Sequence, residues 1–190
     1  VYRGAELDGK ECTSFMNLMN TYDKVIVTGG LSKSYALPGL RIGWLAGPAD
    51  IIEKAWSHHD YTTIAPGILS DHIASLILKP AIRKKILKRS RALINRNLGI
   101  LKDWIEQHEG LFHLIQPKAG AIAFIRYNLD INSSQLANKL REDKSVLIIP
   151  GDFFGMDGYI RLGIGSEKDY FLKGLSLIDE ELNLIRKTAS

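Results

Sequence analysis

The first part of the chain alternates short apolar runs, rich in β-branched residues, with turn residues. Residues 25–27 form one run, which precedes a glycine pair, and residues 42–46 form another, which ends at a glycine and Pro48. Runs of this kind bounded by turn residues are typical of strands, and a proline at this point suits the first turn of a helix through Trp56. Because the apolar residues show little alternation, we expect both faces of these strands to be buried, as in an α/β sheet.

From Pro66 onward the apolar positions recur at helical spacing. One helix is expected from there to about residue 78, and a longer one after Pro80, with Gly110 as its stop. The order that follows is strand, strand, helix, strand, strand, helix. The expected strands are residues 111–115, 121–127, 146–149 and 159–163, and the expected helices open at Ser133 or Ser134, ending near residue 143, and at Ser166.

This order of elements predicts an α/β protein with two packing units that meet near residues 79–80. Residues 1–80 would form the first unit, and residues 81–190 would form the long connecting helix and a small α+β unit. No internal repeat or low-complexity linker interrupts the pattern.

Composition narrows the class of protein. The 190 residues are 45% hydrophobic and 24% charged, with a formal net charge of +4. This balance is typical of a globular protein and excludes a disordered tail, a collagen-like fibre and a disulfide-stapled miniprotein. Cys12 is the single cysteine, so no internal disulfide forms, and no apolar run approaches the ~20 residues that cross a bilayer. We therefore expect a cytoplasmic protein with no membrane partner.

The segment that offers the clearest candidates for reactive and ligand-binding residues is residues 32–44, Ser-Lys-Ser-Tyr-Ala-Leu-Pro-Gly-Leu-Arg-Ile-Gly-Trp. Lys33 lies in a loop just past a predicted strand, and Arg41 lies at the start of the next strand. Open α/β sheets bind ligands at such strand ends. A lysine among apolar residues and beside another cation is a nucleophile toward carbonyls, and the arginine fork meets a phosphate at two points. The two residues together supply what pyridoxal 5′-phosphate needs.

The pattern Ser-Lys-x-x-x-x-Pro-Gly-Leu-Arg-x-Gly-Trp in this segment resembles the lysine motif of the class I and II aminotransferases, which are pyridoxal-phosphate enzymes of fold type I. The resemblance implies that Lys33 forms the Schiff base with the cofactor and moves the proton at the substrate α-carbon, and that Arg41 binds the cofactor phosphate. It also implies the fold: residues 1–80 end the sheet of the large cofactor-binding domain, and residues 81–190 are the connecting helix and the small C-terminal domain.

Two further segments resemble the same family. Tyr2, in Val-Tyr-Arg-Gly, matches the tyrosine that hydrogen-bonds the phenolic oxygen of the cofactor ring. Arg161, in Tyr-Ile-Arg-Leu-Gly, matches the arginine that binds the substrate α-carboxylate, and residues 116–121 resemble a turn of the small domain. The resemblance thus extends over essentially the whole chain.

The sequence departs from the family pattern in two ways. Gly30 stands where the family often has a serine or threonine that contacts the phosphate, which leaves that contact to Ser32 or Thr28. The aspartate that binds the pyridine nitrogen would lie two residues before Val1. Because that aspartate makes the cofactor an effective electron sink, we expect these residues to be the C-terminal portion of a larger enzyme.

Other polar residues have plainer interpretations. The histidines lack the spacing of metal ligands, so no metal site is expected, and Cys12 is expected to be inert. The loop at residues 56–64 has no Lys or Arg, which argues against a dicarboxylate substrate. Basic residues interleave with the apolar positions of the long helix, which favours a solvated face over a nucleic-acid site. These residues are Arg83, Lys84, Lys85, Lys88, Arg89, Arg91 and Arg96.

The predicted function is that of an aminotransferase, which moves an amino group between an amino acid and a 2-oxo acid. The resemblance also implies a homodimer, because relatives build each site from two subunits. Three alternatives stay open: another pyridoxal-phosphate enzyme of the same fold (a lyase, decarboxylase or cyclising synthase), an aminotransferase-like effector-sensing domain of a transcription regulator, and a structural fragment without activity.

Overall fold

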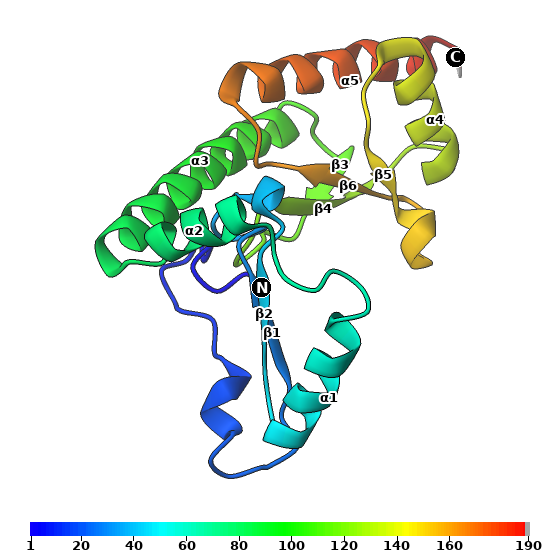
Figure 1. Cartoon of the computed structure of the whole chain (residues 1–190). Coiled ribbons are helices and arrows are strands. Elements are labelled where there is room, and N and C mark those ends of the chain that lie inside the picture. The colour runs from blue at the N-terminus through cyan, green and yellow to red at the C-terminus, as the bar shows by residue number, and fades with distance from the viewer. Residues whose placement is uncertain (189–190) are drawn as a thin grey trace. The chain divides into compact units, whose positions relative to one another are not determined.

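The computed structural model describes residues 1–188 and divides the chain into two compact units (Figure 1). Unit 1 consists of Val1–Arg91 together with the short segment Lys118–Gly120. Unit 2 consists of Ala92–Pro117 and the chain from Ala121 onward. The long helix α3 (Pro80–Glu106) therefore begins in unit 1 and ends in unit 2.

Unit 1 contains a two-stranded antiparallel sheet and the helices that follow it. Strands β1 (Val27–Gly30) and β2 (Gly43–Ala46) pair with Gly29 opposite Trp44. A Cβ added at Gly29 would overlap the Trp44 indole, so only glycine fits beneath this ring. The other elements of the unit are η1 (Phe15–Leu18), η2 (Pro38–Leu40), α1 (Ala49–His59), α2 (Ile68–Ile77) and the first part of α3.

The core of unit 1 joins the loop after β1 to helices α2 and α3. The loop contributes Leu31 and Tyr35, α2 contributes Ala74 and Ile77, and α3 contributes Leu87. Burial of a large apolar side chain stabilises a fold by about 1.5–3 kcal/mol. The loop that contains Lys33 is therefore held to the helices by its own apolar residues.

Burial of both strand faces, which the continuous apolar runs predict, is not found in the described chain. Ile26, Trp44 and Leu45 expose 52%, 43% and 40% of their surface. A sheet face is buried only where a second layer covers it. The residues of unit 1 supply two strands and leave these side chains uncovered.

Unit 2 is built on a four-stranded antiparallel sheet in the order β3–β4–β6–β5. On β4, Ala123, Ile125 and Tyr127 are buried, and on β6 so are Ile160 and Leu162. Because side chains alternate along a strand, the intervening residues lie on the opposite, open face of the sheet. The elements of the unit are β3 (Phe112–Leu114), β4 (Ile122–Tyr127), α4 (Ser133–Lys144), β5 (Ile149–Pro150), η3 (Gly151–Phe154), β6 (Tyr159–Gly163), α5 (Lys168–Thr188) and the second part of α3.

Two side chains of α3 connect the helix to the rest of unit 2. Asn97 is fully buried, and its amide donates to the carbonyl oxygens of Ile164 (3.2 Å) and Ser166 (2.8 Å), just after β6. Trp104 packs on Phe112 of β3 and donates from its indole N–H to Asp179 of α5 at 2.8 Å. Buried polar groups that find partners in this way fix the position of the helix.

The observed elements follow the predicted order, with shifts at their ends. Strand β1 covers Val27–Gly30 instead of residues 25–27, because the pairing with β2 starts at Val27 and includes the glycine pair that was expected to end the strand. Helix α4 is capped by Asn132 and not by Ser133 or Ser134: the Asn132 side chain accepts the N–H groups of the first turn. The Ser133 N–H donates instead to Asp157, a pairing of residues distant in sequence.

Gly151 gives a test of packing in unit 2. A Cβ added there would overlap the carbonyl oxygen of Met156 and lie 2.7 Å from that of Tyr159. Because both obstacles are backbone atoms, Gly151→Ala is expected to lower the free energy of unfolding by about 3 kcal/mol. Gly174→Ala in α5 is the matched control: it meets open space and is expected to stabilise the helix by about 0.5–1 kcal/mol. Denaturant unfolding of both variants checks the pair, and equal stability would contradict the contact.

Candidate functional site

Lys33 and Arg41 lie in one loop whose two ends are hydrogen-bonded to each other. The loop connects β1 to β2, and the Leu31 N–H donates to the Ile42 carbonyl at 3.1 Å. Lys33 comes two residues after the first of these residues, and Arg41 comes one residue before the second. The closure therefore keeps the two cations near the same end of the sheet.

The two residues after Lys33 are buried in unit 1, whereas Lys33 itself is exposed to solvent. Ser34 is 1% exposed, and its hydroxyl donates to the Val1 carbonyl at 2.8 Å. Tyr35 belongs to the core of unit 1. Lys33 itself is exposed, so the apolar surroundings expected for it are not provided by the described chain. The loop presents its amine as an accessible group.

Arg41 has an unusual backbone conformation. It follows the short helix η2 and adopts a left-handed conformation with φ of 53°, two residues before β2 begins. Non-glycine residues in this region cost about 1–2 kcal/mol and are frequent at functional sites. One of its N–H groups donates to the Pro38 carbonyl at 2.9 Å, and the side chain is exposed. The other donors of the fork stay available for a ligand.

Tyr2 is held by a segment that lies far away in the sequence. A Cβ on Gly120 would come within 2.8 Å of the Tyr2 ring, so the ring packs directly on this glycine. The Gly120 N–H donates to the Ala5 carbonyl at 2.9 Å, and the Leu7 N–H donates to the Lys118 carbonyl at 2.8 Å. Since Ser34 also binds Val1, the structure brings the Tyr2 segment to the Lys33 loop. The contact between Gly120 and Tyr2 was not predicted by the resemblance of residues 116–121 to a small-domain turn.

Glu6 stabilises the same segment and is a residue that the sequence did not single out. Its carboxylate accepts the Gly4 N–H at 2.9 Å and the Cys12 N–H at 3.0 Å. Burial favours the neutral acid, but these hydrogen bonds outweigh it and hold the pKa of Glu6 below its ordinary value. Burial, together with the Glu6 charge, raises the pKa of the Cys12 thiol, which keeps the thiol protonated.

Arg161 lies in unit 2, on the open face of the sheet. On β6 it stands opposite Phe124 of β4 and Ile149 of β5. Phe124 stacks on Tyr159, with ring centroids 5.0 Å apart, so an aromatic pair lies beside the arginine on the same face. The side chain is half-buried, and no carboxylate among the described residues pairs with it. Arg161 can therefore meet an anion from outside the unit.

The groups of unit 1 fit pyridoxal phosphate by their chemistry. The loop at residues 31–42 has a primary amine, a guanidinium and two serine hydroxyls, and it contains no acidic residue that would neutralise its charges. The Ser32 hydroxyl has no hydrogen-bond partner among the residues that the structure describes. A ligand with a phosphate and an aldehyde matches this set, since the phosphate binds cations and hydroxyls and the aldehyde reacts with the amine.

The described residues also bear on metal binding and on membrane insertion. No group of three or more His, Cys, Asp and Glu side chains within residues 1–188 is arranged to hold a metal ion. Among the helices of that part of the chain, none is both long enough and apolar enough to span a membrane.

The basic face of α3 is only partly a solvated surface. Lys84, Lys85, Lys88 and Arg89 are exposed, as expected. Arg83 is exposed as well but donates to Tyr35, and the half-buried Arg91 donates to the Gly4 carbonyl. Arg96 is exposed and donates to Asn97. The sequence does indicate one feature of Arg83 and Arg91: each lies four residues from Leu87, which places all three residues on one helix face.

Comparisons with known proteins agree with the motif. The family described as aminotransferase class I and II matches residues 1–171. A crystal structure of a PLP-dependent aminotransferase from Streptococcus suis 89-1591 has a TM-score of 0.86 and 34% identity, covering 97% of this chain and 47% of that one. Capreomycidine synthase from Streptomyces vinaceus is 31% identical, and aspartate aminotransferase from Streptomyces avermitilis is 29% identical.

The matched regions cover only part of the length of those relatives. The two curated matches cover 84% and 85% of this chain but 41% of each relative, so the chain spans less than half of their length. The match extends from the Tyr2 segment through the Lys33 loop to Arg161, and the mixed α/β structure agrees with that of fold-type I enzymes. The chain belongs to the aminotransferase class I and II family.

Proposed function

We propose that the intact protein is a pyridoxal-phosphate-dependent aminotransferase, which moves an amino group between an amino acid and a 2-oxo acid. The observation that carries the proposal is the closed loop with Lys33, Arg41 and no acid. It lies in a chain of the aminotransferase class I and II family that is similar to a solved PLP-dependent aminotransferase. Bound pyridoxal phosphate supplies an aldehyde that reacts with amines and a ring that withdraws electrons from the substrate α-carbon.

Each candidate site residue of unit 1 has a distinct role in this proposal. Lys33 Nζ holds the cofactor covalently and moves a proton at the substrate α-carbon. The Arg41 fork binds the phosphate, and the unpartnered Ser32 hydroxyl supplies the contact that Gly30 cannot make. The Tyr2 phenol, kept in place by Gly120, donates to the phenolic oxygen of the ring.

In unit 2, Arg161 binds the substrate α-carboxylate. Phe124 and Ile149 stand on the strands on either side of it, so apolar side chains border the arginine. A carboxylate bound by a bidentate fork in such surroundings is held in one orientation.

The organisation of the protein follows from the same proposal. Residues 1–80 end the large cofactor-binding domain, and residues 81–190 form the connecting helix and the small domain. We further propose a cytoplasmic homodimer: Cys12 is a free thiol, which suits a reducing compartment. Size-exclusion chromatography with light scattering tests the dimer.

A second reaction is favoured by one relative. Capreomycidine synthase shares 31% identity with the chain, so the same lysine can serve a synthase instead of a transaminase. Product analysis separates the two: a transaminase forms a new amino acid only when a 2-oxo acid is supplied, whereas a synthase converts its amino acid without an acceptor.

Arg41→Met tests the phosphate site. Each charged hydrogen bond contributes about 1.5–3 kcal/mol, so the variant is expected to bind pyridoxal phosphate about 10- to 100-fold more weakly. Absorbance titration measures the affinity, with Arg89→Met, an exposed arginine on α3, as control. Saturating cofactor should restore turnover, because the chemistry of Lys33 is intact. An affinity equal to that of the unaltered protein would place the phosphate elsewhere.

A further inference from the structure

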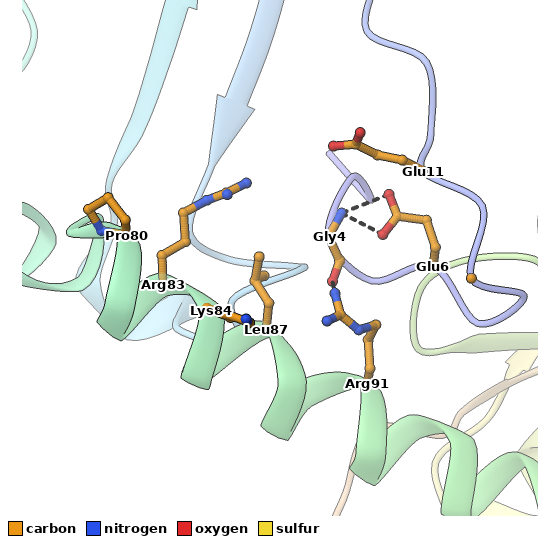
Figure 2. A pocket seen from close by; sticks show the side chains of 9 residues that line it. Gly4, Glu6, Glu11, Pro80, Arg83, Lys84, Leu87 and Arg91 are labelled. Carbon is orange, nitrogen blue, oxygen red and sulfur yellow. Dashed lines mark hydrogen bonds between the residues drawn. The ribbon is translucent and has the colours of Figure 1, made fainter.

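Helix α3 contacts both segments that carry the candidate site of unit 1. The Arg83 Nε donates to the Tyr35 hydroxyl at 2.9 Å, and an N–H of Arg91 donates to the Gly4 carbonyl at 2.9 Å. Figure 2 shows these two arginines extending from the same side of the helix, on either side of Leu87. They line a cavity of about 560 Å³ together with Lys84, Glu6 and Glu11. One contact thus reaches the Lys33 loop and the other the Tyr2 segment.

The partner of Arg83 is placed next to the reactive loop. Tyr35 is 6% exposed and lies two residues after Lys33. Its ring packs in the core of unit 1, and its hydroxyl is the one polar atom of the side chain. Burial of a hydroxyl without a hydrogen-bond partner is unfavourable. The bond from the Arg83 guanidinium therefore favours the observed position of the Tyr35 ring.

The conformation of Lys33 depends on the residues that follow it. The Ala36 N–H donates to the Lys33 carbonyl at 2.9 Å, and the Leu37 N–H donates to the Leu31 carbonyl at 3.1 Å. With Ser34 bound to Val1 and Tyr35 bound to Arg83, the turn around Lys33 is fixed on its inner side. These contacts hold the backbone from which the Lys33 side chain extends.

Arg83 differs from its basic neighbours on the same helix. Arg83, Lys85 and Arg89 are all exposed, but Lys85 and Arg89 have no hydrogen bond or ion pair to any side chain in the described chain. The carboxylates at the cavity are already engaged: Glu6 binds backbone N–H groups, and Glu11 pairs with Arg3 at 2.7 Å. The Arg83 side chain is therefore directed at the tyrosine and not at an acid.

We propose that Arg83 is a positioning residue for Lys33, which acts by holding Tyr35 and thereby the turn that presents the lysine amine to the cofactor. The inference rests on the proposed function of Lys33. It assigns to the long helix a role in preparing the cofactor site, in addition to its role in connecting the two units.

A double-mutant cycle on the intact protein tests this role. The variants are Arg83→Met, Tyr35→Phe and both together, with Arg89→Met as the control and Arg83→Lys as the conservative replacement. Two quantities are measured: hydrogen exchange of the backbone amides at residues 31–41 without cofactor, and the affinity for pyridoxal phosphate by absorbance titration. Tyr35→Phe removes a single oxygen atom, so this arm does not depend on a variant that disturbs folding.

Each single variant is expected to raise the loop exchange rate and the cofactor dissociation constant about tenfold, the loss of roughly one charged hydrogen bond. Because both act through the same contact, the double variant should be no worse than either single one. Arg83→Lys should recover part of the affinity, and Arg89→Met should change neither quantity.

Four results would overturn the role. Unchanged loop exchange in both single variants would mean that the contact does not hold the turn. Raised exchange with unchanged cofactor affinity, or additive effects in the double variant, would leave the bond as a structural contact only. If the unaltered protein bound no cofactor while the exchange data responded as expected, the proposed function would fall along with the positioning role.

Discussion

Lys33→Ala is expected to reduce turnover of the intact protein by at least about 10⁴-fold. Positioned proton transfer alone contributes about 10²- to 10⁴-fold, and the covalent role of the same amine adds to it. The long-wavelength absorbance that arises when the cofactor is bound to a lysine should disappear, whereas the affinity for the cofactor phosphate should fall much less, because Arg41 is intact. Steady-state kinetics and absorbance spectra measure the two effects.

The control for this variant is Lys54→Ala. Lys54 is exposed on α1 in the same unit, so its loss removes one lysine charge without touching the loop. A small primary amine added to the Lys33→Ala protein should restore part of the proton transfer. Normal absorbance and turnover in the Lys33→Ala protein would refute the assignment of Lys33 and, with it, the assignment of the loop at residues 31–42 as the cofactor site.

The loop at residues 31–42 could be predicted because its signals are local. A strand end, a lysine and an arginine within one short segment indicate a ligand site, and the structure adds the closure by Leu31 and Ile42. The orientation of Lys33 also has a local cause, since the next two residues are buried. What the pattern could not supply is the left-handed backbone at Arg41, which depends on the short helix before it.

The contacts between distant segments could not be predicted from the same patterns. Gly120 beneath Tyr2 and Arg83 beside Tyr35 join residues that are far apart in sequence, and neither hydrophobic periodicity nor spacing encodes such pairs. The basic positions on α3 were expected to be solvated, and Lys85 and Arg83 are both exposed, but Arg83 also donates to the Tyr35 hydroxyl. A side chain on the edge of a buried stripe can face either water or protein, and tertiary contacts decide between them.

The exposed face of β2 marks another limit of reasoning from pattern. Continuous apolar residues indicate a strand that suits burial on both faces, but they do not say which segments cover it. In unit 1 the described residues leave Trp44 and Leu45 open to solvent. The pattern was therefore informative about the strand itself and uninformative about its neighbours.

Arg161→Gln is expected to lower kcat/KM for the amino acid substrate by about 10²- to 10³-fold. A bidentate arginine forms two charged hydrogen bonds with a carboxylate, each worth about 1.5–3 kcal/mol, and glutamine keeps the approximate length but loses the charge and the fork. The affinity for pyridoxal phosphate should not change, because the proposed phosphate contacts come from Arg41 and Ser32 and not from Arg161. The kcat/KM of Arg161→Lys should lie between those of the unaltered protein and Arg161→Gln, because lysine retains the charge but not the fork.

Arg126→Gln is the matched control for this effect. Arg126 lies on β4 on the same open face, opposite Tyr159, and is exposed, so the change in net charge of unit 2 is identical. If a general electrostatic attraction of the face were responsible, both variants would lose activity equally and added salt would reduce both losses. A loss confined to Arg161→Gln and insensitive to salt requires a direct bond to the substrate. We expect this result because Arg161 is half-buried and stands between Phe124 and Ile149 of the neighbouring strands, whereas Arg126 is exposed.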